Sequence, residues 1–219
     1  MKIAVLGTGA VGQTIARRLG ELGHEVTVGA RSADSPSLEP FSEFTGVAAG
    51  SFADAAAASE LVFSCVNGEH TLAALEAAGA DNLAGKTLVD TGNFLDHSGE
   101  GMPRPGATLD NCLGAQIQER FPEARVVKSL NTMNNQVMVD PSIVEGDHSV
   151  FVSGDDAAAK DQLKGLLKEF GWRDIQIVDL GGIKTAAAAE MLMPLWIDLV
   201  IARGGFGAGP FNIGVHSAV

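Results

Sequence analysis

Residues 3–12 have the sequence IAVLGTGAVG, in which a short apolar run leads directly into a glycine-rich turn. The apolar run is typical of a strand buried on both faces, and residues 13–22 are compatible with a helix. Gly7 permits a tight strand-to-helix turn, Gly9 lets the backbone approach a pyrophosphate, and Gly12 allows close packing of helix and strand. The free N–H groups at the start of the helix then face the phosphates. We therefore predict a dinucleotide site on this turn, formed by Gly7, Thr8, Gly9, Ala10, Val11 and Gly12.

The end of the second apolar run, Val26–Ala30, indicates which dinucleotide binds. Enzymes that use NAD normally carry Asp or Glu there, because the carboxylate holds the ribose 2′-hydroxyl. This chain has Ala30 at that position, followed by Arg31 and Ser32. A guanidinium pairs bidentately with the 2′-phosphate of NADP, and a hydroxyl donates one more hydrogen bond. NADP(H) is therefore the predicted cofactor, and the alternative is that Arg31 is a solvated loop residue.

Short apolar runs alternate with helix-compatible segments along most of the chain. Most runs are rich in Val, Ile and Leu on consecutive positions, which favours strands covered on both faces. This alternation predicts an α/β fold of the Rossmann type, with a doubly wound, mostly parallel sheet and right-handed crossovers. The predicted strands are Ile3–Leu6, Val26–Ala30, Leu61–Val66, Thr87–Thr91, Arg125–Leu130, Ser149–Ser153 and Ile175–Leu180, and the clearest helices are Val11–Leu22, Phe52–Ser59, Glu69–Ala78, Asn111–Phe121 and Ala157–Phe170.

The pattern changes after residue 182, and this change predicts two parts. Residues 1–182 form a dinucleotide-binding Rossmann domain, and residues 183–219 form a C-terminal helix and tail. Residues 184–203 predict one long helix, kinked at Pro194. Because this helix is apolar nearly all round, we expect it to pack on the cleft or in the interface of a homodimer.

Composition excludes several classes of partner. The chain of 219 residues has 15 basic and 27 acidic side chains, a formal net charge of −12, which argues against nucleic acid or an anionic membrane surface as a partner. The longest apolar stretch, residues 186–202, contains Glu190 and Asp198, so we expect no membrane span. Met1-Lys2 leads straight into the first strand without a signal-peptide pattern, which predicts a cytoplasmic protein.

Few side chains offer catalysis of their own. Cys65 and Cys112 lie far apart without a Cys/His cluster, so we expect small buried residues, no metal site and no disulfide framework. His70 and His97 lack an evident carboxylate or nucleophile partner. The chain has no serine-hydrolase or zinc-protease motif and no P-loop lysine, which argues against hydrolases and NTPases.

Polar residues follow the fourth and fifth predicted strands, where ligands of doubly wound folds gather. Asn93 follows the fourth strand, as a ligand-binding residue or as an Asx-turn that ends the strand. Asn131 and Thr132 follow the fifth strand, and their position favours a functional role over a turn role. Lys128, within the fifth strand, is expected at an edge or extending outward. The loop 98–106 is typical of a mobile flap over the site.

Five segments make the sequence similar to the NADPH-dependent coenzyme F420 reductase-like family of NADP oxidoreductases. The similarity extends over nearly the whole chain. The glycine turn is shared with many families, whereas Leu-Asn-Thr after the fifth strand and Pro-Leu-Trp in the last helix are more specific. The segments are Gly7–Gly12, Gly29–Ser32, Val89–Asn93, Val127–Thr132 and Met193–Trp196.

The resemblance implies hydride transfer between the nicotinamide of NADP and a small-molecule redox acceptor, which is coenzyme F420 or a flavin-like compound. It also implies that the nicotinamide ring and the acceptor ring stack beside the carboxyl ends of the strands. It implies no catalytic side chain, because both reactive atoms belong to cofactors and the protein supplies alignment. By position it implies that Thr8, Arg31 and Ser32 hold the 2′-phosphate, that Cys65, Val66 and Asn67 line the third-strand crossover near the ribose and phosphates, and that Asn131, Thr132 and Met133 border the nicotinamide.

One departure and two alternatives accompany this resemblance. The family usually has Asn-Pro-Leu after the fourth strand, whereas this chain has Asn93-Phe94-Leu95, which alters the expected pocket wall. A reductase of a small carbonyl or imine is one alternative, although such enzymes follow the sheet with a much longer helical domain. A non-catalytic NADP sensor is the other.

Overall fold

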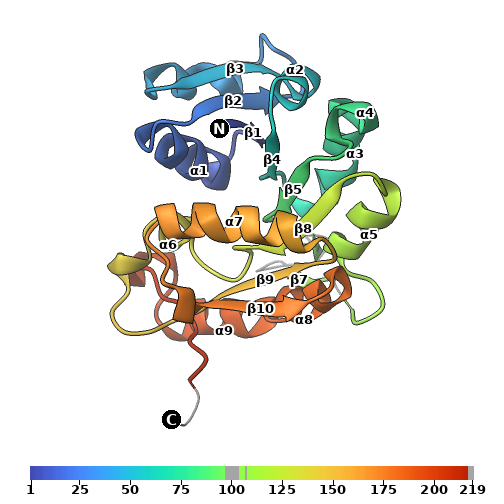
Figure 1. Ribbon diagram of the computed structural model, residues 1–219. Coiled ribbons are helices and arrows are strands. Elements are labelled where there is room, and N and C mark those ends of the chain that lie inside the picture. Colours follow the sequence, from blue (N-terminus) through green and yellow to red (C-terminus); the bar gives the residue numbers. More distant parts are fainter. Residues whose placement is uncertain (97–103, 107, 217–219) are drawn as a thin grey trace.

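A single sheet runs through the centre of the molecule with helices on both faces (Figure 1). The computed structural model describes residues 1–96, 104–106 and 108–216. The sheet strands are β1 (Lys2–Leu6), β2 (Glu25–Ala30), β3 (Val47–Ser51), β4 (Leu61–Ser64), β5 (Thr87–Asp90), β8 (Arg125–Ser129), β9 (Val150–Gly154) and β10 (Ile177–Gly181), and a separate hairpin joins β6 (Leu95–Asp96) to β7 (Arg104–Pro105).

The strand order confirms the predicted doubly wound sheet. The order is β3-β2-β1-β4-β5-β8-β9-β10, and neighbouring strands from β3 to β8 are all parallel. Strand β9 is antiparallel to β8, and β10 is parallel to β9. The carboxyl ends of β1, β4, β5 and β8 therefore lie at one edge of the sheet. At this edge, between β1 and β4, the strand order changes direction, which is where ligands of doubly wound folds bind.

Helices on the two faces bury alternate residues of the strands. Ile3 and Val5 of β1 belong to a core shared with α1, α6 and α7, whereas Ala4 and Leu6 belong to a core shared with α2 to α5 and α8. This arrangement explains why the strands are apolar on consecutive positions. The helices are α1 (Ala10–Glu21), α2 (Phe52–Ala57), α3 (Gly68–Ala78), α4 (Ala80–Leu83), α5 (Leu113–Arg120), α6 (Asn135–Val139), α7 (Ala157–Glu169), α8 (Ala186–Glu190) and α9 (Met193–Ala202), with short 3₁₀ turns at Pro36–Glu43, Pro141–Ile143, Asp174–Gln176, Ile183–Thr185 and Phe206–Ala208.

All seven predicted strands and all five clearest helices are present, with bounds shifted by at most two residues. The edge strand β3 is not among the predictions because Val47-Ala48-Ala49-Gly50-Ser51 lacks the large apolar residues that mark a buried strand. Its pairing with β2 supplies the order that its own side chains do not. The hairpin β6–β7 was also missed, since two-residue strands leave no periodic pattern.

The prediction of one C-terminal helix kinked at Pro194 is wrong. Helix α8 ends at Glu190, α9 begins at Met193, and Pro194 lies in the first turn of α9. Proline is favourable there because its missing N–H would have no partner in the first turn. Residues 183–202 are long and apolar enough, by length and composition alone, to count as a candidate membrane span, a test that a buried core helix also passes. In this structure Glu190, at the end of α8, binds Lys128 inside the fold at 3.0 Å.

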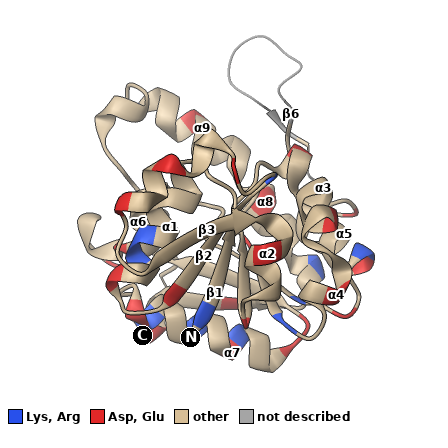
Figure 2. Cartoon of the chain, turned by 90° about the horizontal axis from the view of Figure 1, so that it is seen from above, with Lys and Arg blue, Asp and Glu red and all other residues tan. Residues whose placement is uncertain are grey.

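The C-terminal segment lies at the edge of the sheet where the parallel strands end. Figure 2 shows α9 and β6 beyond the carboxyl ends of β1 and β2, opposite the N-terminus. Phe211 of the tail stacks on Trp196 of α9, with ring centroids 5.6 Å apart and 19° between the planes. The N–H of Phe211 donates to Oδ1 of Asn134, 3.3 Å away, at the start of α6. The tail therefore fastens α9 beside the loop that follows β8.

Candidate functional site

The glycine turn has the geometry that its sequence predicts. Gly7 has a φ of 118°, and a Cβ there would lie 2.6 Å from the carbonyl oxygen of Cys65. A Cβ on Gly12 would lie 2.1 Å from the carbonyl oxygen of Gly7, so this glycine lets α1 start directly against the turn. A Cβ on Gly9 would meet nothing within 4 Å. Gly9 therefore borders open space, as a residue that approaches a ligand must.

The start of α1 is suited to a phosphate group. Gly9 is its N-cap and has no side chain to accept from the first N–H groups, and the first turn contains no acidic residue. The N-terminal N–H groups of a helix without such partners bind anions, and the helix dipole adds to the attraction. The side-chain amide of Gln13 donates to the carbonyl oxygen of Thr8 at 3.0 Å, so this bond connects the first turns of α1 to the glycine turn. These residues fit a pyrophosphate.

The end of β2 lies next to this turn, because the N–H of Gly7 donates to the carbonyl oxygen of Gly29 at 3.0 Å. Arg31 follows, is exposed, and has no ion-pair partner among the described residues. The hydroxyl of Ser32 donates to the carboxylate of Asp34, and this bond lowers the pKa of Asp34 below its ordinary value. Arg31 is thus available for a 2′-phosphate, while Ser32 must leave Asp34 before it can donate to one.

Arg17 and Arg18 do not add to this positive site. They lie two turns along α1 from Gly9, at about 1.5 Å of rise per residue, roughly 12 Å away. The guanidinium of Arg17 lies 4.5 Å from the centre of the Phe44 ring, and Arg18 pairs with Glu21 at 3.7 Å. Arg31 is consequently the guanidinium best placed for the nucleotide.

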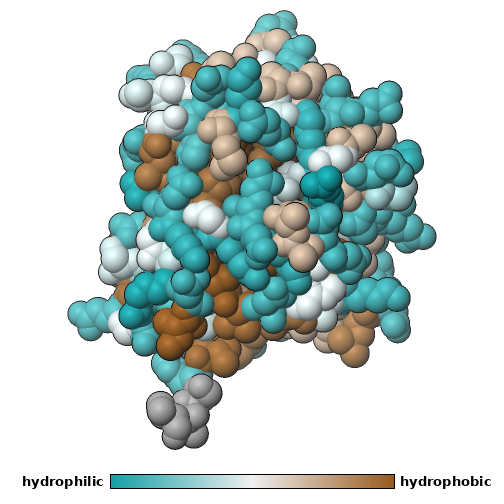
Figure 3. Space-filling model, viewed as in Figure 1, coloured by the Kyte–Doolittle hydropathy of each residue, from teal (hydrophilic) through white to brown (hydrophobic). Residues whose placement is uncertain are grey.

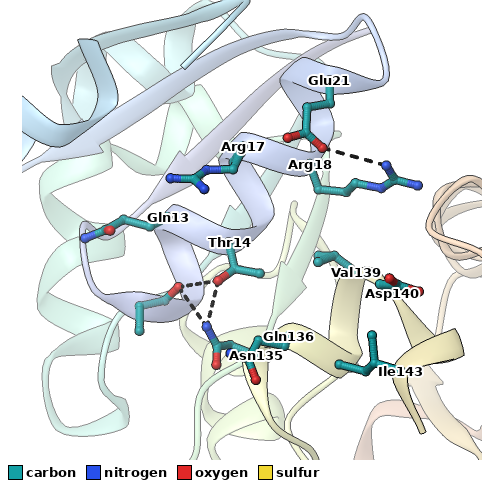
Figure 4. A pocket seen from close by; sticks show the side chains of 11 residues that line it. Gln13, Thr14, Arg17, Arg18, Glu21, Asn135, Gln136, Val139, Asp140 and Ile143 are labelled. Carbon is teal, nitrogen blue, oxygen red and sulfur yellow. Dashed lines mark hydrogen bonds and ion pairs between the residues drawn. The ribbon is translucent and has the colours of Figure 1, made fainter. Parts of the chain in front are cut away.

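A groove of about 600 Å³ between α1 and α6 is separate from this site. Figure 4 shows the Asn135 side chain reaching from α6 to α1, where its amide donates to Thr14 at 2.7 Å. Of the predicted site residues, the groove contains only Ala10. Its lining residues are Ala10, Gln13, Thr14, Arg17, Arg18, Glu21, Asn135, Gln136, Val139, Asp140 and Ile143.

The crossover after β4 faces the glycine turn with Cys65, Val66 and Asn67. Cys65 is half-buried against Gly7 and Gly12, and burial raises the pKa of its thiol to about 12. A thiol with that pKa stays protonated at neutral pH, so Cys65 packs and does not act as a nucleophile. Asn67 is exposed at the start of α3, and its side chain makes no capping bond there.

The polar residues predicted after the fourth and fifth strands meet one another. Nδ2 of Asn93 donates to the carbonyl oxygen of Asn131 at 2.8 Å, and Nδ2 of Asn131 donates to Oδ1 of Asn93 at 2.9 Å. Gly68 lets α3 approach this pair, because a Cβ there would lie 2.1 Å from the carbonyl oxygen of Asn93. The Asn93–Asn131 pair therefore forms a fixed polar edge at the carboxyl ends of β5 and β8.

The backbone that leads to Asn131 is strained. Leu130 has a φ of 66°, the one described residue other than glycine in the left-handed region, and is almost fully buried. Such a conformation costs about 1–2 kcal/mol for a residue with a Cβ, and it persists only where the surroundings enforce it. Thr132 and Met133 are also buried, so of the three residues predicted to border the nicotinamide, Met133 belongs mainly to the core.

The prediction that Lys128 lies at an edge or extends outward is wrong. It is 1% exposed, and its Nζ lies 2.6 Å from Oδ2 of Asp90 and 3.0 Å from Oε1 of Glu190. Burial lowers the pKa of Lys128, but the two carboxylates outweigh it and raise that pKa above its ordinary value. Asp90 and Lys128 are register partners on neighbouring strands, which the strand pairing reveals, and the one sequence signal was Glu190, a charge that interrupts an Ala-rich segment.

The remaining candidates contribute less. The ring of Phe94 lies over Gly106, where a Cβ would be 2.2 Å from the ring, so Phe94 packs on the base of the β6–β7 hairpin. His70 is an exposed residue in the first turn of α3. His97 and most of the loop 98–106, predicted as a flap, lie outside the described residues. Among the described residues, no group of His, Cys, Asp and Glu could hold a metal ion.

Comparisons with known proteins agree with this geometry. The sequence profile of the family described as NADP oxidoreductase, coenzyme F420-dependent, matches residues 2–94. A candidate F420-dependent NADP reductase from Arthrobacter sp. FB24, solved by crystallography, is 50% identical, with a TM-score of 0.91 over 99% of this chain and 100% of that one. No curated protein matches the sequence.

More distant structures share the fold alone. An imine reductase from Streptomyces aurantiacus is 19% identical, with a TM-score of 0.66. A reductive aminase from Aspergillus terreus, solved in complex with NADPH4, cyclohexanone and allyl amine, is 22% identical, with the same TM-score. The match with the imine reductase covers 92% of this chain, and the match with the reductive aminase covers 93% of it. In both cases this chain spans only 62% of the length of the other protein.

Two glycine substitutions separate ligand binding from folding. Gly9→Ala should change the free energy of unfolding by less than about 0.5 kcal/mol, because its Cβ enters open space and its φ of −73° suits alanine. It should still raise the Kd of NADPH about tenfold or more, equivalent to about 1.4 kcal/mol, because the Cβ occupies the space that the pyrophosphate needs.

The matched variant Gly12→Ala should instead destabilise the fold by about 1–3 kcal/mol, since its Cβ collides with backbone. Urea unfolding and NADPH titration measure the two effects. Unchanged NADPH affinity in Gly9→Ala would contradict the placement of the pyrophosphate at this turn.

Proposed function

The chain belongs to the family of coenzyme F420-dependent NADP oxidoreductases and is an NADP-dependent oxidoreductase, and we propose that its acceptor is coenzyme F420 or a flavin-like compound. One observation carries the proposal most strongly. The 50% identity to the Arthrobacter protein extends over the whole chain, including the C-terminal segment that borders the carboxyl-end edge. An acceptor that stacks on the nicotinamide must bind at that edge.

Selectivity for the phosphorylated dinucleotide is supported by charges at the end of β2. Ala30 replaces the acid that an NAD site requires, and Arg31 is exposed without an ion-pair partner among the described residues. Asp34, whose carboxylate accepts from Ser32, is the one acidic group in this loop. Arg31 is therefore the proposed main ligand of the 2′-phosphate, and Thr8 and Ser32 are its proposed neighbours there.

Hydride transfer here requires placement more than acid–base chemistry. NADPH, when bound, supplies the hydride, and a deazaflavin or flavin acceptor takes its accompanying proton from solvent. The α1 start holds the pyrophosphate, Arg31 holds the 2′-phosphate, and the Asn93–Asn131 pair offers a polar edge to the nicotinamide.

We also propose that the protein is a homodimer that pairs through the C-terminal helices. Helix α9 packs its Met193, Trp196, Ile197 and Val200 in a small cluster of their own, while Leu195 and Ile201 are 50% and 56% exposed. Figure 3 shows hydrophobic residues gathered at the end of the molecule where Figure 1 draws α9, β10 and the C-terminus. Exposed apolar patches of this kind are typical of subunit interfaces.

Arg31→Ala should raise the Kd of NADPH about tenfold or more, because it removes a charge-assisted pair of about 1.5–3 kcal/mol. The Kd of NADH should change little, since NADH has no 2′-phosphate. Arg120→Ala is the matched control, because Arg120 pairs with Glu76 on the outer face of α5. Fluorescence titration measures both cofactors, and an equal loss for NADPH and NADH would contradict the role of Arg31.

Mixing the NADPH-loaded protein with coenzyme F420 or a flavin should accelerate NADPH oxidation in a single turnover. The nicotinamide absorption band reports the rate, and a cyclic imine serves as the comparison acceptor. Tight NADPH binding without oxidation by any deazaflavin or flavin would contradict the proposed acceptor class.

Leu195→Lys should convert a dimer into a monomer in light scattering, because a charge in an apolar interface is not compensated. Ile175→Lys is the control, since Ile175 is 76% exposed and lies in the 3₁₀ turn before β10, outside α9. A wild-type monomer, or a dimer that survives Leu195→Lys, would contradict this interface. Deletion of residues 184–219 is a poorer test, because it also removes Glu190 from Lys128.

A further inference from the structure

Three ionisable side chains from separate segments meet in the interior beneath the carboxyl-end edge. Asp90 ends β5, Lys128 lies opposite it on β8, and Glu190 ends α8. None is more than 1% exposed, and the ammonium of Lys128 lies within 3.0 Å of both carboxylates. We name these residues the buried triad.

The buried triad holds the loop that leads to the proposed nicotinamide site. Nζ of Lys128 donates to the carbonyl oxygen of Gly92, and Oδ1 of Asp90 accepts from the N–H of Gly92 at 3.1 Å. The triad therefore fixes both backbone polar groups of Gly92, its N–H and its carbonyl. The next residue is Asn93, whose side chain is paired with Asn131. A change in the triad is transmitted to this pair through one residue of backbone.

The third member joins this loop to the C-terminal helices. Oε2 of Glu190 accepts from the N–H of Leu113 at 2.9 Å, and Oε1 accepts from the N–H of Gly114 at 3.1 Å. These are the first N–H groups of α5, which have no partner within their own helix and favour a negative charge. Glu190 is thus bound by an ammonium and a helix start, and α9 begins three residues later.

We propose that Asp90, Lys128 and Glu190 are positioning residues for hydride transfer. They set the Asn93–Asn131 edge against the nicotinamide and tie its position to α8 and α9, where the acceptor binds. The proposal rests on the proposed function for the identity of the acceptor. It concerns the orientation of the bound nicotinamide, since no member of the triad approaches the phosphate-binding turn or Arg31.

Glu190→Gln tests the proposal with little change in volume. It leaves the Asp90–Lys128 pair neutral but places an amide where a carboxylate accepts three hydrogen-bond donors. The single-turnover rate of NADPH oxidation should fall about tenfold to a hundredfold, as expected when a reactant is misplaced by a fraction of an ångström, with the Kd of NADPH within about twofold of wild type. The fluorescence of protein-bound NADPH at saturation should also change, and this readout needs no acceptor.

Two further variants complete the design. Glu169→Gln is the matched control, because it removes the same charge from a pair with His24 at the opposite end of the sheet, and it should leave rate, affinity and fluorescence unchanged. Gly92→Ala keeps all three charges, but its Cβ would lie 3.2 Å from Oδ1 of Asp90 and 3.1 Å from Leu113. It should lower the rate in the same direction, and it carries the test if Glu190→Gln does not fold.

The possible failures can be distinguished. A folded Glu190→Gln or Gly92→Ala with wild-type rate and wild-type NADPH fluorescence would overturn the positioning role and leave the triad purely structural. An equal fall in rate and NADPH affinity would overturn it as well. A wild-type protein that binds NADPH but reduces no deazaflavin or flavin would overturn the proposed acceptor, and the fluorescence comparison would still decide the role of the triad.

Discussion

The ammonium of Lys128 lies inside the protein, and the need to neutralise it organises the carboxyl-end edge of the sheet. Removing one partner from a buried ion pair costs about 3–5 kcal/mol, because the other charge is left without compensation. Asp90 and Glu190 supply that compensation from two segments that are 100 positions apart in the chain. If the C-terminal helices detached from the sheet, Glu190 would leave Lys128, and one of the buried charges would lose its partner. An apolar replacement would fill the same space with less desolvation, so a cluster of this kind at a ligand edge calls for a reason beyond stability.

A second constraint comes from the sign of the charge. The chain has a formal net charge of −12, yet its cofactor is an anion, so binding depends on a small local surplus of positive potential. The start of α1, left free of side-chain caps and acidic residues, provides one part of it, and Arg31 provides the other. Figure 2 shows acidic residues spread over many elements, and the chain has 27 of them against 15 Lys and Arg residues. We therefore propose that two positions, and not a broad basic surface, select the nucleotide.

Much of this could be predicted from the sequence, and the limits have physical causes. The glycine turn, the missing acid at Ala30 and the apolar strands are local signals, and the structure agrees with them. The strand β3 carries small residues and depends on its neighbour for order, so no local pattern marks it. Lys128 was misjudged because a lysine near a strand end usually reaches solvent, and only the pairing of β5 with β8 brings Asp90 beside it. The helix break falls at Glu190 because Pro194, four residues later, has no N–H to donate to the Glu190 carbonyl, and sequence periodicity does not show whether such a proline kinks a helix or divides it in two.

The central claim is that the bound nicotinamide and the acceptor ring lie in contact at the edge formed by Asn93 and Asn131, so that hydride passes directly between them. Single-turnover reaction with NADPH carrying deuterium at both C4 positions, followed by mass spectrometry of the reduced F420, tests this claim most directly. Direct hydride transfer predicts one deuterium in each molecule of reduced F420. Reduced acceptor without deuterium would contradict direct transfer, and with it the placement of the two rings.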